Sequence, residues 1–404
     1  MKIVHIQQYF NEKMGYQENI FPYYQKKLGH DVVLITSTRS NGFNNDPRVK
    51  KEGEFIENGF KVKRINIFNE FKDRFVVFKK LYEYLEAEKP DYIYHHGVNS
   101  PSLRTASIYK KNNPNVFLAV DNHSDLNIAA RNKLWKVFYY NLLWKNIIAK
   151  YDKYIDLYFG VTPARCVFLE EELGINREKI RLLPIGADVD NVKASISKKE
   201  FLEKYNIDRN CLLITHGGKI TPEKQNDRII EAFLRLKDRN VRLIIFGLIK
   251  DKRVQELIKN DDRIIFLGWL NREDTLTVLK YSDVGIWNTQ HTTLLEDCVA
   301  VGLPMILRYY GSTCHLIDDT GLFLYDGSIR EIQDKLQLII NNDNILNQFK
   351  DKAHNIRDLL SYENIAKESI KYYYSTDYND IHKKFMSIVY SDENYKNFRV
   401  MDRS

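Results

Sequence analysis

Residues 212–234 read LLITHGGKITPEKQNDRIIEAFL and contain the strongest local feature of the chain. The apolar run Leu212–Thr215 leads through two glycines and a polar loop to apolar residues at helical spacing from about Asn226. A buried strand that turns through a glycine-rich loop into an amphipathic helix is typical of α/β proteins with parallel sheets. The stretch therefore predicts one strand–loop–helix unit of such a sheet.

Similar units recur along the chain in two consecutive series. The predicted strands are Ile3–Ile6, Val32–Ile35, Val62–Ile67, Tyr92–Tyr94, Val116–Val120 and Leu157–Val161, then Leu212–Thr215, Leu243–Phe246, Ile264–Leu267, Val284–Trp287 and Met305–Leu307. Near-continuous apolar strands that alternate with helical segments indicate parallel sheets covered on both faces. Two series predict two Rossmann-like, doubly wound domains.

The domain boundaries follow from breaks in this pattern. We expect an N-terminal domain over residues 1–190 and a C-terminal domain over residues 191–375, because a polar stretch at 193–199 separates the two series. A chain of 404 residues is also too long for one hydrophobic core. A final helix at about residues 376–404 is expected to pack back on the first domain. Within that domain, Thr162 as N-cap, Pro163 at the first helical position and Gly174 as a stop define one helix.

The composition narrows the class of protein. Apolar residues make up 44% of the chain, and 61 basic against 54 acidic residues give a net charge of +7. This excess suits phosphorylated ligands, an anionic membrane surface or nucleic acid, and by itself selects none of them. Basic and acidic residues alternate throughout without a base-reading module, so we expect no nucleic-acid partner. Scattered cysteines, no signal-peptide pattern and no apolar run of roughly 20 residues predict a cytoplasmic protein.

The loop after Leu212–Thr215 is the strongest candidate for a ligand site. Gly218 allows close approach of the backbone to a ligand, and Lys219 and Lys224 can converge on one anion near a helix N-terminus. A transferred sugar leaves a diphosphate behind, and positive charge would stabilise that leaving group. A tight turn with two solvated lysines explains the same spacing.

A second candidate follows the strand Val284–Trp287. Glu296, at the start of a helix, has a carboxylate that can accept both hydroxyls of a ribose, and the amides before it, near Thr292, can hold phosphate oxygens. An acid favoured by the helix dipole explains Glu296 equally well.

Two further candidates lie in the first series. Gly15 lies in the loop after the first strand, at the sheet edge where doubly wound domains bind ligands. His123 directly follows the strand Val116–Val120, and His95 and His96 end another strand in the same way. An ordinary turn and structural histidines remain the simpler explanations.

Taken together, these residues resemble glycosyltransferase family 4, whose members are retaining enzymes. Further motifs carry the likeness over nearly the whole chain: Gln8-Tyr9-Phe10, Leu28–Val32, Lys89–Ile93, Leu183–Asp188, Phe266–Gly268 and Glu296–Pro304. The resemblance implies the GT-B fold, in which two Rossmann-like domains face a central cleft. It also implies transfer from a nucleotide-diphosphate sugar, with a UDP-sugar favoured, without metal or other cofactor.

The resemblance also assigns roles to the candidate residues. Lys219 and Lys224 would bind the donor diphosphate, Glu296 the ribose, and the backbone near Leu270 the base. His123 would orient the transferred sugar rather than act as nucleophile. Gly15 and Gly218 correspond to the family's phosphate-side glycines, and Thr292 to its donor loop.

The chain departs from the family pattern at three places. Asn288 replaces the first glutamate of the family's Glu-seven-residues-Glu motif, and the bulkier Thr289–Thr292 replaces glycines. Lys219 stands where arginine is usual, and His315 where an acid is common. The changes at Asn288 and Thr289–Thr292 favour an unusual donor sugar or reduced activity.

The acceptor and the rival functions are less constrained by sequence. Aromatic residues interleave with lysines over residues 132–159, including Lys133, Trp135, Lys136, Phe138 and Trp144. This pattern suits a membrane surface and a lipid-linked saccharide acceptor for surface polysaccharide assembly, or else a helix that buries its aromatics against the sheet. A nucleotide-sugar epimerase, a phosphorylase or a catalytically silent partner subunit would share the same architecture.

Overall fold

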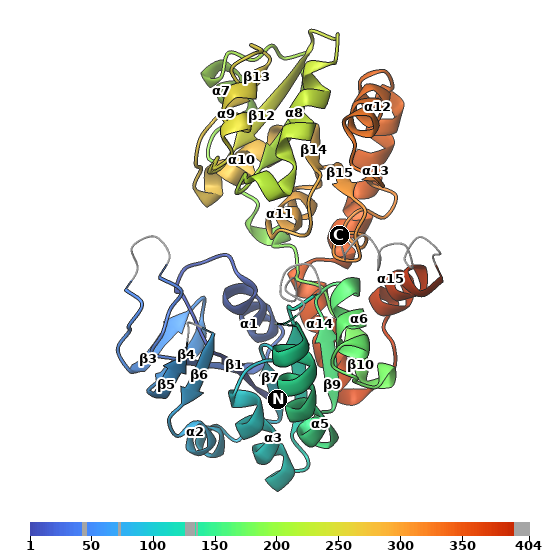
Figure 1. The fold of residues 1–404 in the computed structure, drawn as a ribbon. Helices are drawn as coiled ribbons and strands as arrows, with labels where there is room; N and C mark the ends of the chain where they lie inside the picture. Colours follow the sequence, from blue (N-terminus) through green and yellow to red (C-terminus); the bar gives the residue numbers. More distant parts are fainter. Residues whose placement is uncertain (43–46, 72–73, 126–133, 135, 392–404) are drawn as a thin grey trace. The chain divides into compact units, whose positions relative to one another are not determined.

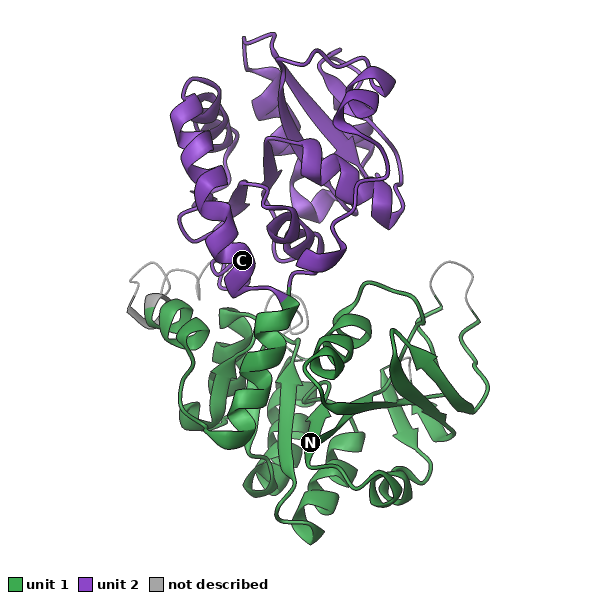
Figure 2. Ribbon diagram, turned by 180° about the vertical axis from the view of Figure 1, so that it is seen from behind, with its two compact units in different colours: residues 1–186, 362–404 green, residues 187–361 purple. Residues whose placement is uncertain are grey.

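The computed structural model describes residues 1–42, 47–71, 74–125, 134 and 136–391. The chain divides into two compact units, one built from residues 1–186 and 362–404 and the other from residues 187–361 (Figure 2). The helix α14, Tyr362–Tyr374, therefore belongs with unit 1, whereas the sequence pattern placed residues up to 375 in the second domain. The limits of the two domains as folding units remain a prediction.

Unit 1 is built on an eight-stranded sheet with the order β10-β9-β8-β7-β1-β2-β4-β3. Every neighbouring pair is parallel except β3 with β4. Its strands are β1 (Lys2–Gln7), β2 (Asp31–Ser37), β3 (Gly53–Glu57), β4 (Phe60–Ile65), β7 (Tyr92–His95), β8 (Phe117–Asn122), β9 (Leu157–Gly160) and β10 (Ile180–Leu182). A separate hairpin pairs β5 (Ile67–Phe71) with β6 (Phe75–Phe78).

The helices of unit 1 pack against the strands of this sheet (Figure 1). They are α1 (Gln17–Lys27), α2 (Leu81–Glu88), α3 (Ser102–Asn112), the π-helix η2 (Lys136–Trp144), α5 (Lys145–Tyr151), α6 (Pro163–Glu171), α14 and α15 (Asp380–Ser391). Near the end of the chain, α14 packs on α1, where the rings of Tyr24 and Tyr362 stack at 5.8 Å. This packing explains why α14 joins unit 1 although it follows unit 2 in sequence.

Unit 2 is built on a six-stranded, wholly parallel sheet with the order β13-β12-β11-β14-β15-β16. The strands are β11 (Leu212–Gly217), β12 (Val241–Phe246), β13 (Ile264–Phe266), β14 (Val284–Trp287), β15 (Met305–Arg308) and β16 (Gly321–Leu324). The helices are α7 (Lys198–Lys204), α8 (Asn226–Leu234), α9 (Lys252–Leu257), α10 (Arg272–Tyr281), α11 (Leu294–Val301), α12 (Ile329–Ile340) and α13 (Asp343–Leu359). In the core of unit 2, the apolar residues of α8 pack in one cluster with buried residues of β11 and β12.

Every strand predicted from the sequence is present. The predicted helix is also confirmed, because α6 begins at Pro163 and the Thr162 side chain accepts a hydrogen bond from the Arg165 amide. The strands β3, β5, β6, β10 and β16 were missed, since they are short or carry polar residues among apolar ones. Over the described residues, no helix combines the length and the apolar character needed to cross a membrane.

Candidate active site

The edge of the unit 2 sheet that follows β11, β12 and β13 is lined by glycine. Gly218, Gly247 and Gly268 each follow one of these strands, with φ values of +111°, +114° and +69°. A Cβ on Gly247 would lie 2.0 Å from the Gly218 carbonyl oxygen, whereas a Cβ on Gly218 would meet nothing within 4 Å. The backbone at Gly218 therefore borders open space, as the approach of a ligand requires.

Lys219 and Lys224 follow this edge, as the sequence predicted. Among the residues that the structure describes, neither ammonium group has a hydrogen-bond or ion-pair partner. Burial lowers the pKa of Lys224, Glu223 opposes this change, and the charge of Lys219 lowers the pKa further. The two lysines are thus close enough to repel each other, and an anion bound between them would relieve that repulsion.

Glu296 lies on the first turn of α11 and is only 4% exposed. Its Oε1 atom is 2.6 Å from Nε2 of His291, while its Oε2 atom is buried without a hydrogen-bond partner. An unpartnered carboxylate oxygen in the interior is costly, and a ligand hydroxyl would satisfy it. Sequence reasoning missed His291, although its position on the loop five residues before Glu296 offered a signal.

Asn288, at the end of β14, is also buried with one polar atom unmatched. Its amide donates to the Gly327 carbonyl at 3.0 Å, and its Oδ1 atom has no partner. A Cβ on Gly327 would lie 2.2 Å from Asn288 Oδ1 and 2.6 Å from a nitrogen of Arg308, so these three residues are in close contact. The position predicted to contact the donor sugar therefore lies beside a guanidinium group.

The remaining candidates of unit 2 lie in loops. Leu270 is partly exposed after Gly268, whose carbonyl accepts the Gly247 amide at 2.7 Å. Thr292 is partly exposed before α11, and its carbonyl accepts the Leu295 amide at 2.9 Å.

In unit 1, His123 directly follows β8, and its Nε2 atom is 3.3 Å from Asp121 Oδ2. Asp121 is fully buried, and the same oxygen is 3.0 Å from Nδ1 of His96. Burial opposes ionisation of Asp121, but the neighbouring His123 and His96 outweigh it and hold the pKa well below its usual range. The three ligand-type atoms lie within 4.8 Å of one another, and their separations from Asp121 are those of hydrogen bonds.

Gly15 is exposed in the loop between β1 and α1. Its φ is not in the left-handed region, so the backbone conformation alone does not require glycine there. Glu18, one turn further on in α1, has a pKa raised by burial and interacts electrostatically with His96, His123 and Asp121. The loop after β1 and the end of β8 therefore meet at one edge of the unit 1 sheet.

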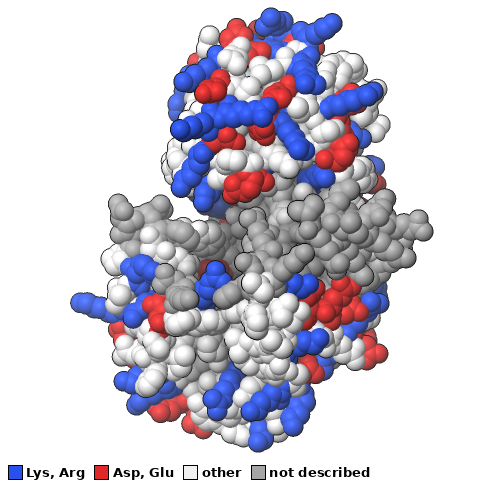
Figure 3. All heavy atoms as spheres, in the orientation of Figure 1, with Lys and Arg blue, Asp and Glu red and all other residues white. Residues whose placement is uncertain are grey.

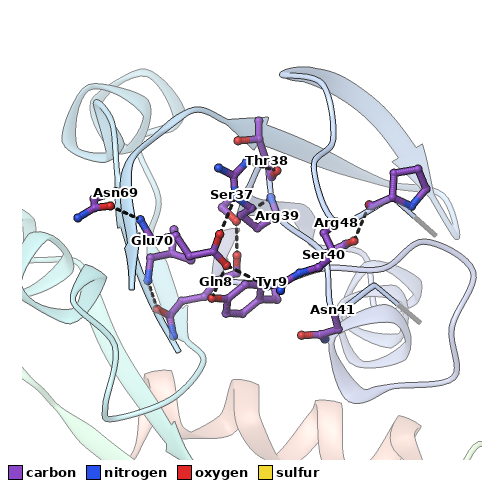
Figure 4. Close-up of polar contacts among 12 residues, drawn as sticks. Gln8, Tyr9, Ser37, Thr38, Arg39, Ser40, Asn41, Arg48, Asn69 and Glu70 are labelled. Carbon is purple, nitrogen blue, oxygen red and sulfur yellow. Dashed lines mark hydrogen bonds and ion pairs between the residues drawn. The ribbon is translucent and has the colours of Figure 1, made fainter. Parts of the chain in front are cut away.

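A polar network holds the loops after β1 and β2 (Figure 4). Tyr9 donates to Oε1 of Glu70 at 2.9 Å, and Arg39 donates to Oε2 at 2.7 Å. Arg48 also donates to Oε1 of Glu70, at 3.3 Å. Two guanidinium groups thus share one carboxylate at this edge.

Aromatic residues of the 132–159 segment divide between the interior and the surface. Asn132, Lys133 and Trp135 lie outside the described residues. Tyr139, Tyr140 and Trp144 of η2 are buried, and the first and last of these contact Phe75 of the β5–β6 hairpin. Four apolar side chains of η2 itself are exposed, and we call them the η2 patch: Val137, Phe138, Leu142 and Leu143.

Two lysines beside a glycine-lined strand edge suit a diphosphate, and two doubly wound units of this kind make up the GT-B class of glycosyltransferase folds. Comparison with known proteins gives the family. A profile described as "Glycosyl transferases group 1" matches residues 197–356, and one described as "Glycosyltransferase Family 4" matches residues 23–191. The chain belongs to glycosyltransferase family 4.

Solved structures share the whole fold. A glycosyltransferase from Rickettsia africae has a TM-score of 0.68 at 18% identity, over 93% of this chain and 98% of that chain. Anabaena HepE in complex with UDP-glucose has a TM-score of 0.65 at 14% identity, over 93% of this chain and 100% of that chain. The predictions of the family and of the GT-B fold are confirmed.

One curated relative is informative about chemistry. The Escherichia coli UDP-Gal:alpha-D-GlcNAc-diphosphoundecaprenol alpha-1,3-galactosyltransferase is 25% identical over 205 residues. The match covers 46% of this chain and 51% of the relative, so it spans about half the length of either protein. The roles of individual residues in this chain stay predictions.

Proposed function

We propose that this protein is a retaining glycosyltransferase that moves a hexose from a UDP-sugar to a lipid-linked saccharide, in the assembly of a surface polysaccharide or glycoconjugate. The observation that carries the proposal is the pair of lysines, Lys219 and Lys224, at the glycine-lined edge of unit 2, whose ammonium groups have no hydrogen-bond or ion-pair partner among the described residues. Two ammonium groups at an open strand edge favour the binding of a negatively charged diphosphate over the binding of a neutral ligand.

In the proposed reaction, the bond between the anomeric carbon and the diphosphate oxygen breaks while the acceptor oxygen attacks from the same face. Lys219 and Lys224 stabilise the charge that develops on the departing diphosphate. An oxygen of that diphosphate takes the acceptor proton, so His123 orients the donor sugar and does not become a nucleophile. Neither step requires a metal or other cofactor.

The donor is proposed to bind through Glu296 and the neighbouring loops. The buried, unpartnered Oε2 of Glu296 would accept a ribose hydroxyl, and the backbone near Leu270 would contact the base. Gly15 and Gly218 would lie against the phosphates, and Asn288 and Thr292 against the sugar. UDP is favoured because the Escherichia coli relative uses UDP-galactose and HepE was solved with UDP-glucose.

A lipid-linked acceptor is proposed from the surface of unit 1. The η2 patch exposes several large apolar side chains, of which Phe138 is 62% exposed, and Lys145 and Lys150 on α5 are exposed as well. Figure 3 shows a broad area without charged side chains on one face of unit 1. Apolar residues flanked by lysines favour an anionic lipid surface.

The donor proposal is tested by measuring thermal stability and slow donor hydrolysis with a panel of UDP-, GDP-, ADP- and CDP-sugars. A nucleotide-specific shift and hydrolysis that falls by about 10²- to 10³-fold in Lys224→Ala are expected, with partial recovery in Lys224→Arg. Lys259→Ala, an exposed lysine of the same unit, is the matched control. Unchanged turnover in Lys224→Ala would sink the assignment.

The same panel addresses the rival functions. An epimerase would convert the donor sugar without an acceptor and release no free nucleotide. A silent partner subunit would show no turnover with any donor and would activate a second chain. A flat response to every nucleotide sugar would favour the silent subunit over the enzyme.

The acceptor proposal is tested by sedimentation with vesicles that contain phosphatidylglycerol. The wild type should sediment with the vesicles, and the double variant Phe138→Ser with Leu142→Ser should remain in the supernatant. Leu338→Ser on α12 removes an exposed apolar residue elsewhere and serves as the control. Equal sedimentation of all three proteins would contradict a role for the η2 patch.

A further inference from the structure

A continuous chain of buried polar side chains connects α14 to His123. Each member is less than a tenth exposed, and the members come from α14, α1, β1, the loop after β7 and β8. In order, they are Ser369, Gln25, His5, His96 and Asp121. Such a chain restricts where each proton lies, because every contact needs one donor and one acceptor.

The proton assignment starts at Ser369. Its hydroxyl donates to the Ala366 carbonyl at 2.7 Å, so its oxygen is left as an acceptor. The amide group of Gln25 therefore donates to Ser369 through Nε2, at 3.1 Å. This orientation turns the other end of the amide, Oε1, toward His5 as an acceptor.

His5 is neutral and holds its single proton on Nε2. Gln25 Oε1 lies 2.6 Å from that nitrogen and can only accept a hydrogen bond. Burial lowers the pKa of His5 to about 3, and the charge of His96 lowers it in the same direction. With one proton on Nε2, the Nδ1 atom of His5 is an acceptor.

Both ring nitrogens of His96 then face acceptors. Nε2 is 3.1 Å from the bare Nδ1 of His5, and Nδ1 is 3.0 Å from the carboxylate of Asp121. A neutral His96 would direct a lone pair at one of these acceptors and leave that buried polar contact unmade, which is unfavourable. A doubly protonated His96 satisfies both contacts.

We propose that this buried chain holds His96 as an imidazolium, and that the resulting ion pair with Asp121 fixes the tautomer of His123. The Oδ1 atom of Asp121 accepts the Gly97 amide at 2.7 Å, and Oδ2 lies 3.3 Å from His123 Nε2. His123 therefore donates through Nε2–H. Its Nδ1 atom is left to accept a hydrogen bond from a ligand.

This inference rests on the proposed function only for the identity of the ligand that contacts His123, which is the donor sugar. In the proposed reaction, His123 selects a donor sugar that presents a hydroxyl as hydrogen-bond donor. His5 and Gln25 are then positioning residues, because they act on the ligand only through His96, Asp121 and His123.

The other ionisable groups around His96 do not replace this arrangement. Glu18 of α1 interacts with His96, His123 and Asp121, and burial raises its pKa, which favours its neutral form. The ring of Tyr94 lies 4.9 Å from the His96 ring, and burial raises the pKa of Tyr94 well above its usual range.

His95, the adjacent histidine, provides an internal control. Burial lowers the pKa of His95 to about 3, and its Nε2 atom is 2.8 Å from the Ser102 hydroxyl rather than from a carboxylate. Two neighbouring buried histidines should therefore differ in charge, with His95 neutral and His96 cationic.

The test is nitrogen-15 NMR of the histidine rings in the ligand-free full chain at pH 7, after treatment with EDTA. Signals are assigned with the variants His95→Gln and His96→Gln. We expect two protonated nitrogens on His96, one on His95, one on His5, and a proton on Nε2 of His123. A single protonated nitrogen on His96, or a proton on Nδ1 of a neutral His123, would overturn the proposal.

Two further arms separate positioning from a merely structural role. In His5→Phe the acceptor for His96 is lost, so His96 should fall to one protonated nitrogen while His95 is unchanged. Equimolar Zn²⁺ should leave the ring signals in place, whereas metal-bound signals from His96 and His123 would refute the hydrogen-bonded assignment. None of these measurements needs a donor sugar, so they stand apart from a failure of the proposed function.

Discussion

Replacing Glu296 separates ligand binding from folding in unit 2. In the ligand-free protein one carboxylate oxygen is held by His291 at 2.6 Å, and the other is buried without a partner. A half-satisfied buried carboxylate contributes little net stability, because the unmet oxygen costs about 1–3 kcal/mol and offsets the bond that is made. We therefore expect Glu296→Ala to lower the free energy of unfolding by less than about 1 kcal/mol.

The same substitution should weaken donor binding strongly. If the ribose forms two hydrogen bonds to the carboxylate, at least one of them charge-assisted, their loss costs about 3 kcal/mol. That free energy corresponds to a dissociation constant about 150-fold higher. Glu296→Gln keeps one acceptor and should lose roughly half of this free energy.

The assay is isothermal titration with the nucleotide sugar that the panel identifies, alongside urea unfolding without ligand. At 100 times its dissociation constant a donor stabilises the wild type by about 2.7 kcal/mol, and this gain should nearly vanish in Glu296→Ala. Glu273→Ala, an exposed acid on α10, should bind as the wild type does. Wild-type affinity in Glu296→Ala, or a loss of several kcal/mol of stability without ligand, would contradict this role for Glu296.

Two further predictions concern the same unit. Burial raises the pKa of Asp297 to about 6 although Arg272 opposes it, so the folded protein keeps a proton that the unfolded chain releases near pH 4. The stability from this group is present below the unfolded pKa and is lost as pH rises through about 6. The free energy of unfolding of Asp297→Asn, measured with urea, should therefore rise by up to about 3 kcal/mol relative to that of the wild type between pH 4 and 7. A constant difference across that range would contradict the assignment. Gly218 and Gly247 have similar positive φ values, but only at Gly247 would an alanine Cβ lie against a backbone oxygen. We expect the first to lose about 1 kcal/mol and the second at least about 3 kcal/mol, and equal losses in thermal melts would show that the clash is relieved.

Much of the fold could be predicted because its signal is local. The runs that become β1, β2, β11 and β12 are nearly continuous apolar segments, and burial on both faces of a parallel sheet requires such runs. The strands β5 and β6 escaped notice because β5 exposes Phe68 and Phe71 and contains Asn69 and Glu70, while β6 has only four residues. Phe75 of β6 contacts Tyr139 and Trp144 of η2, and no local pattern reveals a contact between segments so far apart in sequence.

The candidate site was predicted only in part. Gly218, Lys219, Lys224 and Glu296 could be singled out because a glycine turn, two lysines and a helix-initial acid have chemical meaning in sequence alone. His291 was missed: it lies five residues before Glu296, but its contact with that side chain depends on how the loop before α11 bends.

Local sequence patterns are enough to predict the two series of strands, the α/β class and the residue types that suit a diphosphate. Those features follow from hydrophobic periodicity and from side-chain chemistry, which act within short stretches of chain. Tertiary structure decided which distant residues meet. Gln25, His5, His96 and Asp121 come together only because the strand order β8-β7-β1 and the packing of α14 on α1 align them. Hydrogen bonds between residues so far apart in sequence then fix protonation states that no local pattern can specify.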